Sequence, residues 1–356
     1  MKALITAGGH ATRLRPITYT TNKHLIPVAN KPLIFYALEK FADTEIKEVA
    51  INVNKGEVKL KEAVGDGSRW GLKITYIEQK GGALGVAHVI KNARTFLGDD
   101  DFVFYLGDNI ILGSIHDFIN KFKNDKLNCL LALSKVRDPQ RFGVPQIDEN
   151  GRIISVEEKP SDPKSEYAVA GIYVYDKTIH AAVDSLKPSN RGELEISEAH
   201  QYFIDHGKKV GYSVITGWWK DTGKPYDLLE GNQLILNSIT EDIKGTVDKG
   251  VDIQGRVVIG EGSRIEGRSF IRGPVHIGKN TIIRGSYIGP YTSIGDRVEI
   301  IGTEIEHSIV FDEADIECNR RIVDSILGRN CTISNSFNTY PRGHKIIAGD
   351  NSQIEL

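Results

Sequence analysis

A glycine-rich turn with three nearby cations lies close to the start of the chain. Gly8 and Gly9 follow a short apolar run, and Arg13, Arg15 and Lys23 come soon after. Glycine lets a ligand approach backbone N–H groups closely, and such groups bind phosphate well when cations are near. Neither the Walker spacing nor a GxGxxG fingerprint is present. The segment predicts phosphate binding, and a surface loop with solvated cations is the alternative.

Two aspartates follow predicted strands in the same half of the chain. Asp108 comes after the apolar run 101–106, and Asp221 comes after the run 210–215. A pair of carboxylates at strand ends can share a Mg²⁺ ion that also contacts phosphate oxygens. A single aspartate in a turn more often caps a helix or closes an Asx turn. The metal prediction therefore depends on both residues acting together.

The elements that must position these residues alternate between strands and helices. Apolar runs predict strands at 3–7, 48–53, 72–77 and 101–106, and helical spacing predicts helices at 33–41 and 83–96. This order predicts an α/β fold with a mostly parallel, Rossmann-like sheet covered by helices on both faces. Ligands bind at the carboxyl ends of such strands, where Gly8, Gly9 and Asp108 are expected.

The second part of the chain has a different period. Isoleucines recur every six residues, the period slips by one at Ile288, and it then resumes through Ile294 and Ile300. The first members of the series are Ile259, Ile265, Ile271, Ile277 and Ile283. A six-residue beat predicts a hexapeptide-repeat, left-handed parallel β-helix in which each isoleucine points inward. We therefore expect one domain at 1–240 and a β-helix domain at 245–356.

Composition excludes several classes of protein. The chain has 45 basic and 47 acidic residues and a formal net charge of −2, which argues against nucleic acid as a partner. Three cysteines without CxxC spacing predict neither a disulfide framework nor a zinc site. No apolar stretch approaches the ~20 residues that cross a bilayer. We expect a cytoplasmic protein without a membrane partner.

Motifs spread over the first 240 residues carry a family resemblance. They include AGGHATRLRPITYTTNKHLIPVANKPL, LGDN, RFGVPQID, EEKP, YAVAGIYVYD, RGELEIS and WWKDTG. In this order they resemble the glucose-1-phosphate thymidylyltransferases, and the added β-helix is similar to the long form of that family. The resemblance implies Mg²⁺-assisted in-line transfer of a nucleotidyl group from dTTP or UTP to glucose-1-phosphate, with dTDP-glucose and pyrophosphate as the products when dTTP is used.

The resemblance also implies roles for individual residues. Arg13 and Lys23 would be catalytic, and Asp108 and Asp221 would hold the metal. The nucleotide would be bound by Gly8, Gly9, Ala11, Thr12, Arg13, Gln79, Gly85 and Asp108. The sugar phosphate would be bound by Gly143, Glu158, Lys159, Tyr173 and Arg191.

Two departures from the family pattern affect the nucleotide site. Ala11 stands where the family usually has glycine, and an added Cβ can crowd phosphates or oppose a positive φ. The segment 79–87 is one residue longer than the usual pattern. Because this loop contacts the base in the family, the choice between dTTP and UTP stays open.

Other functions for the β-helix half and for the whole chain are also open. His276 and His307 allow acetyl transfer in the coil, although a lone histidine there is more often a turn residue. We expect the coil to support homo-oligomerisation or regulation instead. A uridylyltransferase, a bifunctional enzyme and a non-catalytic regulatory subunit are the alternatives. The last is disfavoured because the cationic and acidic positions are all present.

Overall fold

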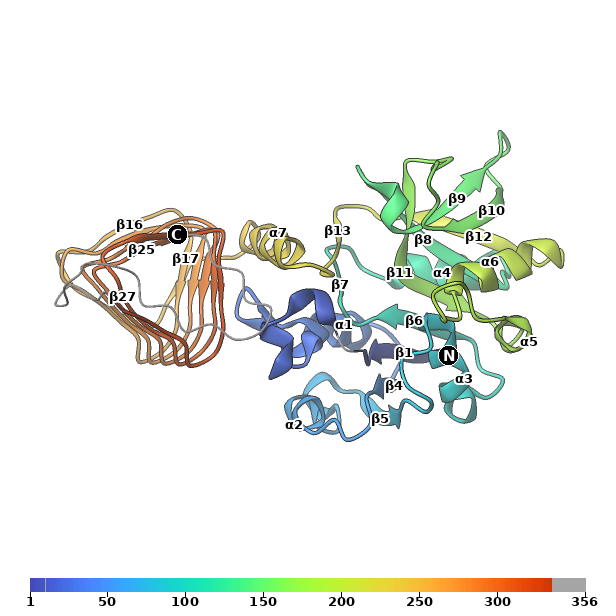
Figure 1. Ribbon diagram of the computed structural model, residues 1–356, viewed down its shortest axis with the longest axis horizontal. Helices are drawn as coiled ribbons and strands as arrows, with labels where there is room; N and C mark the ends of the chain where they lie inside the picture. The colour runs from blue at the N-terminus through green and yellow to red at the C-terminus, as the bar shows by residue number, and fades with distance from the viewer. Residues whose placement is uncertain (10, 335–356) are drawn as a thin grey trace. The chain divides into compact units, whose positions relative to one another are not determined.

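The computed structural model describes residues 1–9 and 11–334, which form two compact units (Figure 1). The first unit contains residues 1–9 and Leu33–Asp221. The second contains Ala11–Pro32 and the described chain from Thr222 onward. The segment Ala11–Pro32 therefore packs with the C-terminal part of the chain. The expected boundary between residues 240 and 245 stays a prediction.

A seven-stranded sheet forms the centre of the first unit. Its order is β12 (Val210–Val214), β8 (Cys129–Lys135), β11 (Tyr167–Tyr175), β6 (Phe102–Leu106), β1 (Lys2–Ala7), β4 (Glu48–Val53) and β5 (Lys73–Glu78). All neighbours pair in parallel except β11, which is antiparallel to both β6 and β8. The predicted α/β class and mostly parallel sheet are confirmed.

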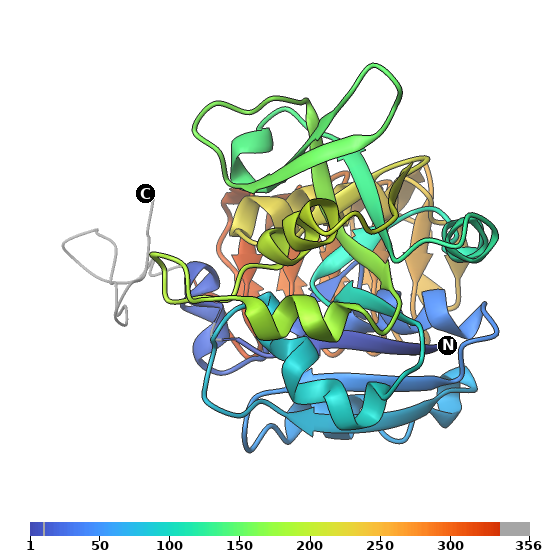
Figure 2. The same cartoon turned by 90° about the vertical axis from the view of Figure 1, so that its right-hand side faces the viewer.

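Helices cover both faces of this sheet (Figures 1 and 2). One face carries α3 (Val86–Leu97), α5 (Ile179–Ser185) and α6 (Ile196–Asp205), whose apolar side chains share a core cluster with Phe102 and Phe104. Side chains alternate along a strand, so Tyr105 points to the opposite face, where its ring meets Phe41 of α1 (Leu33–Ala42). The remaining helices of the unit are α2 (Lys59–Val64) and α4 (His116–Asn124).

Two short antiparallel pairs complete the first unit. β9 (Gly143–Ile147) pairs with β10 (Ile153–Glu158), and β7 (Asn109–Ile111) pairs with β13 (Trp219–Asp221). The second pair brings together chain segments that lie more than a hundred residues apart.

None of the helices among the described residues is long and apolar enough to cross a membrane.

The second unit begins at Ala11 with three 3₁₀ turns, which a short hairpin and a helix follow. The strands β2 (Pro27–Val28) and β3 (Lys31–Pro32) form the hairpin, and α7 (Pro225–Leu236) packs against it.

The parallel β-helix follows, with three sheets. The first contains β14 (Asp242–Ile243), β17 (Val257–Ile259), β20 (Val275–Ile277), β23 (Thr292–Ile294), β26 (Ile309–Val310) and β29 (Ile326–Leu327). The second contains β15 (Thr246–Val247), β18 (Arg264–Glu266), β21 (Ile282–Arg284), β24 (Glu299–Ile301), β27 (Asp315–Glu317) and β30 (Thr332–Ser334). The third contains β16 (Asp252–Gln254), β19 (Phe270–Arg272), β22 (Tyr287–Ile288), β25 (Glu304–Glu306) and β28 (Arg321–Val323).

The six-residue period corresponds to the interior of this coil. Each isoleucine pairs in register with the equivalent residue one turn later, as in the column Ile265, Ile283 and Ile300. The isoleucines of the series are fully buried from Ile259 through Ile316. The slip at Ile288 is a turn shortened by one residue, and it leaves the columns aligned.

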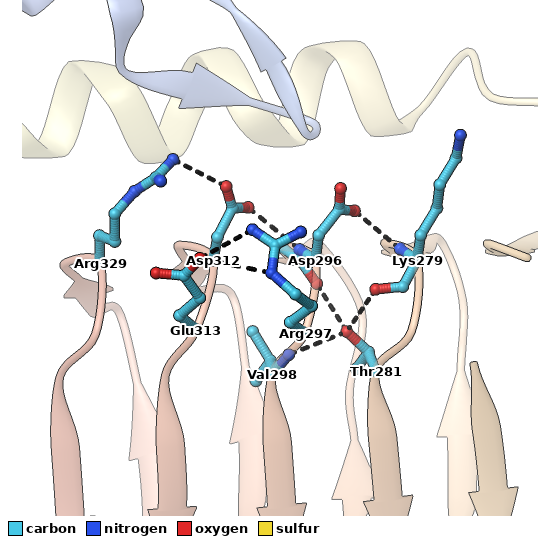
Figure 3. Close-up of polar contacts among 9 residues, drawn as sticks. Lys279, Thr281, Asp296, Arg297, Val298, Asp312, Glu313 and Arg329 are labelled. Carbon is cyan, nitrogen blue, oxygen red and sulfur yellow. Dashed lines mark hydrogen bonds and ion pairs between the residues drawn. The ribbon is translucent and has the colours of Figure 1, made fainter. Parts of the chain in front are cut away.

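The corners of the coil are held by polar side chains that bond to the neighbouring turn. The Thr281 hydroxyl donates to the Gly295 carbonyl at 2.8 Å and accepts the Val298 N–H at 3.1 Å. At the same corner, Asp296 accepts the Lys279 N–H at 2.7 Å, and Asp312 accepts the Asp296 N–H at 3.0 Å (Figure 3). These bonds satisfy backbone donors where the strands end.

Candidate active site

The glycine turn after β1 is bracketed by one asparagine. The Gly9 N–H donates to Asn54 Oδ1 at 2.9 Å, and Asn54 Nδ2 donates to the Gly9 carbonyl at 3.0 Å. Asn54 directly follows β4, the neighbour of β1 in the sheet. Gly9 has a φ of 101°, which strongly favours glycine. The turn is therefore fixed from the side, and its backbone follows the carboxyl end of β1.

Gln79 lies directly over this turn. Its Oε1 accepts a hydrogen bond from Asn52 Nδ2 at 3.2 Å, and its Nε2 donates to the Gly82 carbonyl at 2.8 Å. A Cβ added to Gly8 would lie 2.6 Å from Gln79 Oε1, so the close approach requires glycine. The structure thus brings together the predicted phosphate turn and the residue expected to bind the base.

Gly85 has a structural reason to be glycine. Its φ is 99°, and a Cβ there would lie 2.6 Å from both the backbone N and O of Leu194. On either side of it, the Leu194 N–H donates to the Leu84 carbonyl at 2.8 Å, and the Ala87 N–H donates to the Leu194 carbonyl at 3.2 Å. The loop that contains Gly85 is therefore attached to the segment that carries Arg191 and Glu195.

The two predicted metal ligands lie beside each other. Asp221 pairs across the β7–β13 ladder with Asn109, the residue after Asp108. Asn109 is buried, its Nδ2 donates to Asp108 Oδ1 at 2.8 Å, and its Oδ1 accepts from Trp219 Nε1 at 2.6 Å. Both carboxylates also act on the pKa of the same buried phenol, that of Tyr173.

This pair of carboxylates suits a hard divalent cation. Mg²⁺ is usually held by one or two carboxylates, with water and substrate phosphates completing its shell. Within residues 1–9 and 11–334 no group of three or more His, Cys, Asp or Glu side chains could hold a metal. The donor set at Asp108 and Asp221 therefore fits an ion shared with a phosphate substrate better than an all-protein metal cage.

Glu158 is at the centre of the predicted sugar-phosphate residues. Its Oε2 accepts a hydrogen bond from the Ser197 hydroxyl at 2.6 Å, and Ser197 is buried at the start of α6. Gly143 lies under this bond, because a Cβ there would be 2.7 Å from Ser197 Oγ. The remaining oxygen, Oε1, lies 3.1 Å from Lys159 Nζ. A helix and two strands thus fix this carboxylate.

Arg191 is surrounded by carboxylates. Its guanidinium makes two bonds to Glu195, at 2.7 and 3.1 Å, and lies 3.3 Å from Glu193 and 3.6 Å from Glu158. The hydrogen bond with Glu195 raises the pKa of Arg191 further. To bind a sugar phosphate, Arg191 would have to release part of this network, whereas Lys159 pairs with a single carboxylate among the described residues, that of Glu158.

Tyr173 connects the two groups of acids. Burial raises its pKa well above the ordinary value, and the nearby charges of Glu158, Asp108 and Asp221 raise it further. The phenol therefore stays neutral and can donate a hydrogen bond to an anion or a sugar hydroxyl. The centroids of the Tyr173 and His200 rings lie 5.2 Å apart, and His200 belongs to α6. The position of the phenol therefore depends on the core beneath it.

The predicted catalytic cations belong to the second unit. Thr12 and Arg13 lie in a 3₁₀ turn at Thr12–Leu14, and Lys23 begins another at Lys23–Leu25, which Asn22 caps. Ala11 precedes the first turn with φ 43° and ψ 44°. This is the left-handed conformation that glycine adopts without strain. Ala11 therefore holds the positive φ that its Cβ disfavours, whereas its proposed part in nucleotide binding stays a prediction.

Sequence reasoning missed several polar residues that shape these groups. Asn52 and Asn54 orient Gln79 and Gly9, and Ser197 orients Glu158. Single amides and hydroxyls of this kind carry no spacing signal. Asn52 lies just before the end of a predicted strand, and Asn54 lies just after it. This placement at a strand end was the one clue in the sequence to their role.

Comparison with known proteins identifies the family of this chain. Residues 2–238 match the nucleotidyl transferase family. The glucose-1-phosphate thymidylyltransferases of Streptomyces antibioticus and Streptomyces griseus are 47% and 43% identical to this chain, over its whole length and 99% of theirs. A crystal structure described as a glucose-1-phosphate thymidylyltransferase from Bacillus anthracis, in complex with sucrose, matches with a TM-score of 0.63 and 39% identity. That match covers 68% of this chain and 97% of the other. The chain belongs to the nucleotidyl transferase family.

Proposed function

We propose that this chain transfers a thymidylyl group from dTTP to glucose-1-phosphate, releasing pyrophosphate. The observation that carries the proposal is the paired arrangement of Asp108 and Asp221 at the strand ends, where the Gly8–Gly9 turn also lies. The two full-length relatives carry the name of this activity. The acetyltransferase, uridylyltransferase and regulatory-subunit alternatives are not favoured.

The proposed chemistry needs no protein nucleophile. A phosphate oxygen of the sugar phosphate is already ionised and attacks the α-phosphorus in line, while pyrophosphate leaves opposite. Lys159 and Tyr173 would hold the attacking phosphate, and Glu158 would accept hydrogen bonds from sugar hydroxyls. Gln79 would bind the base, while backbone groups of Gly8, Gly9, Ala11 and Thr12 approach the phosphates. Catalysis then consists of positioning and charge stabilisation.

Charge on the triphosphate would be balanced by Arg13, Lys23 and a Mg²⁺ ion held by Asp108 and Asp221. When bound, the ion supplies Lewis-acid stabilisation of phosphate oxygens. Arg13 has a planar fork that can bind two phosphate oxygens, whereas Lys23 acts as a point charge. In this proposal Arg191 would bind the sugar phosphate, in addition to its ion pairs with Glu158 and Glu195. The homo-oligomer and the cytoplasmic location expected from the sequence stay predictions.

The test is pyrophosphate release by the purified chain with glucose-1-phosphate and Mg²⁺, supplying dTTP, UTP, ATP, CTP and GTP in parallel. We expect the highest kcat/KM with dTTP. Higher kcat/KM with UTP would transfer the assignment to a uridylyltransferase, and no release with any nucleotide would refute the proposal.

Two variants and one control test the assigned residues. Arg13→Ala and Asp108→Asn should each lower kcat by about a hundredfold or more, as removal of one charge-stabilising group does elsewhere. Asp125→Asn is the control, because this exposed aspartate just after α4 forms an ion pair with Lys121 and has no part in the proposed mechanism. Near-normal turnover in Arg13→Ala or Asp108→Asn would remove that residue from the mechanism.

A further inference from the structure

The tip of the β2–β3 hairpin is bonded to the backbone of the β-helix. Ala29 and Asn30 form the tip with φ of 46° and 60°, two left-handed residues in succession. Asn30 Nδ2 donates to the Ile294 carbonyl at 2.6 Å and lies 3.4 Å from the His276 carbonyl. These carbonyls belong to adjacent strands of one coil sheet, β23 and β20. The hairpin is therefore attached to two successive turns of the coil.

Asn232 joins the same hairpin to the coil from helix α7. It is fully buried, and each of its polar atoms has a partner. Its Oδ1 accepts the Ala29 N–H at 2.8 Å and the Ser293 hydroxyl at 2.9 Å. Its Nδ2 donates to the Tyr291 carbonyl at 2.9 Å. One side chain thus connects the hairpin tip, the helix and the coil, and nothing in the glycine or aspartate motifs accounts for it.

The connection from the hairpin to Lys23 is short and stiff. Lys23 lies in a capped 3₁₀ turn that ends at Leu25. Beyond this turn, Ile26 and Val28 are fully buried. No glycine occurs between residues 11 and 32. Because glycine is the residue that gives a chain most freedom, a shift of the hairpin will be transmitted to Lys23 rather than absorbed between them.

We propose that Asn232 is a positioning residue for nucleotidyl transfer. Through Asn232 and the hairpin, the β-helix holds the segment that carries Arg13 and Lys23 in the geometry that binds the nucleoside triphosphate. The coil is thus part of the nucleotide-binding apparatus, in addition to any role in assembly. This inference rests on the proposed function of the two cations.

The test compares three variants of the full chain. Asn232→Leu keeps the approximate volume and removes all three contacts. Asn30→Gly removes the bonds to the coil and keeps the left-handed backbone, so it remains informative if the first variant folds poorly. Asn237→Leu makes the same change at an exposed position just after α7 and is the matched control.

The informative readout is the split between substrates. In Asn232→Leu and Asn30→Gly we expect the KM for dTTP to rise about tenfold, the cost of a lost buried hydrogen bond, while the KM for glucose-1-phosphate changes less than about twofold. An unchanged KM for dTTP in both variants overturns the proposal, and so does an equal rise for both substrates.

Hydrogen exchange separates this inference from the proposed function. Amides in residues 11–32 should exchange faster in Asn232→Leu than in Asn237→Leu, because the segment has lost its attachment to the coil. If the wild-type chain releases no pyrophosphate with any nucleotide, the proposed function fails, and the exchange result alone decides whether the coil holds this segment. Equal exchange in the two variants overturns the structural link.

Discussion

His200 should make the first unit sensitive to mild acid. It lies on α6, is completely buried, and its Nε2 is 2.6 Å from the Tyr175 hydroxyl. Its Nδ1 has no hydrogen-bond partner among the described residues. Burial in this apolar setting lowers the pKa of His200 to about 3. The folded unit therefore holds the neutral imidazole, and the protonated form is available mainly after unfolding.

The size and direction of the effect follow from proton linkage. In the unfolded chain the pKa of a histidine is about 6.5. Between pH 6.5 and 3 the unfolded state binds more protons, so the free energy of unfolding falls as the pH falls. The loss is absent above about pH 6.5, reaches ~2 kcal/mol at pH 5, and is complete near pH 3. The titration thus removes a sizeable share of ordinary domain stability.

Urea unfolding at pH 7.5 and pH 5, followed by tryptophan fluorescence, measures this loss in the free energy of unfolding. The three tryptophans, Trp70, Trp218 and Trp219, all belong to the first unit, so the signal reports on that unit. His200→Phe cannot titrate. It should be less stable at pH 7.5, because the Tyr175 hydroxyl loses its partner, but should lose ~2 kcal/mol less than wild type on acidification. An equal loss in both proteins would refute the reasoning.

Substitutions at three positions test other parts of the structure. Ala11→Gly should raise the midpoint of thermal unfolding slightly, because relief of ~1–2 kcal/mol of left-handed strain exceeds the ~0.5–1 kcal/mol entropic cost of glycine; a lower midpoint would contradict this. Asp312→Ala should lower coil stability by ~1–2 kcal/mol in denaturant melts followed by circular dichroism. Asp312→Asn should cost only ~0.5 kcal/mol, because it keeps the acceptor for the Asp296 N–H and loses only an exposed ion pair with Arg329. Equal losses of stability in the two Asp312 variants would contradict the role of this acceptor. Gly85→Ala should cost at least ~2 kcal/mol in the fluorescence assay, because its Cβ meets the Leu194 backbone.

The β-helix was predictable because its period is local. Each isoleucine of the hexad series lies one strand from the next, so a regular spacing in sequence becomes a regular column in space. The strands of the sheet were likewise predictable from apolar runs, and Glu48–Val53 has the expected bounds. Helix α3 begins at Val86 rather than Ala83, because the loop before it must bring Gly85 against Leu194.

The polar supports of the candidate site were not predictable in the same way. Asn54, Ser197 and Asn232 each act through a partner at least 39 residues away in sequence. A single asparagine or serine gives no periodic signal, and its role appears only when the fold brings the partner close. Arg191 differs from these residues, because its charge in the sequence pointed to phosphate binding. The fold instead surrounds it with three carboxylates.

The segment from Ala11 to Pro32 also shows how the fold and the proposed chemistry depend on each other. Without any glycine, it holds Ala11, Ala29 and Asn30 in left-handed conformations, and the two alanines do so at a cost in backbone strain. Such strain persists only where surrounding contacts determine the backbone. At Ala11 the carbonyl accepts the Thr18 hydroxyl, and at Ala29 the N–H reaches Asn232. The contacts that offset strain at the hairpin come from α7 and the coil, so the loss of the coil should first be felt in the segment that carries Arg13 and Lys23.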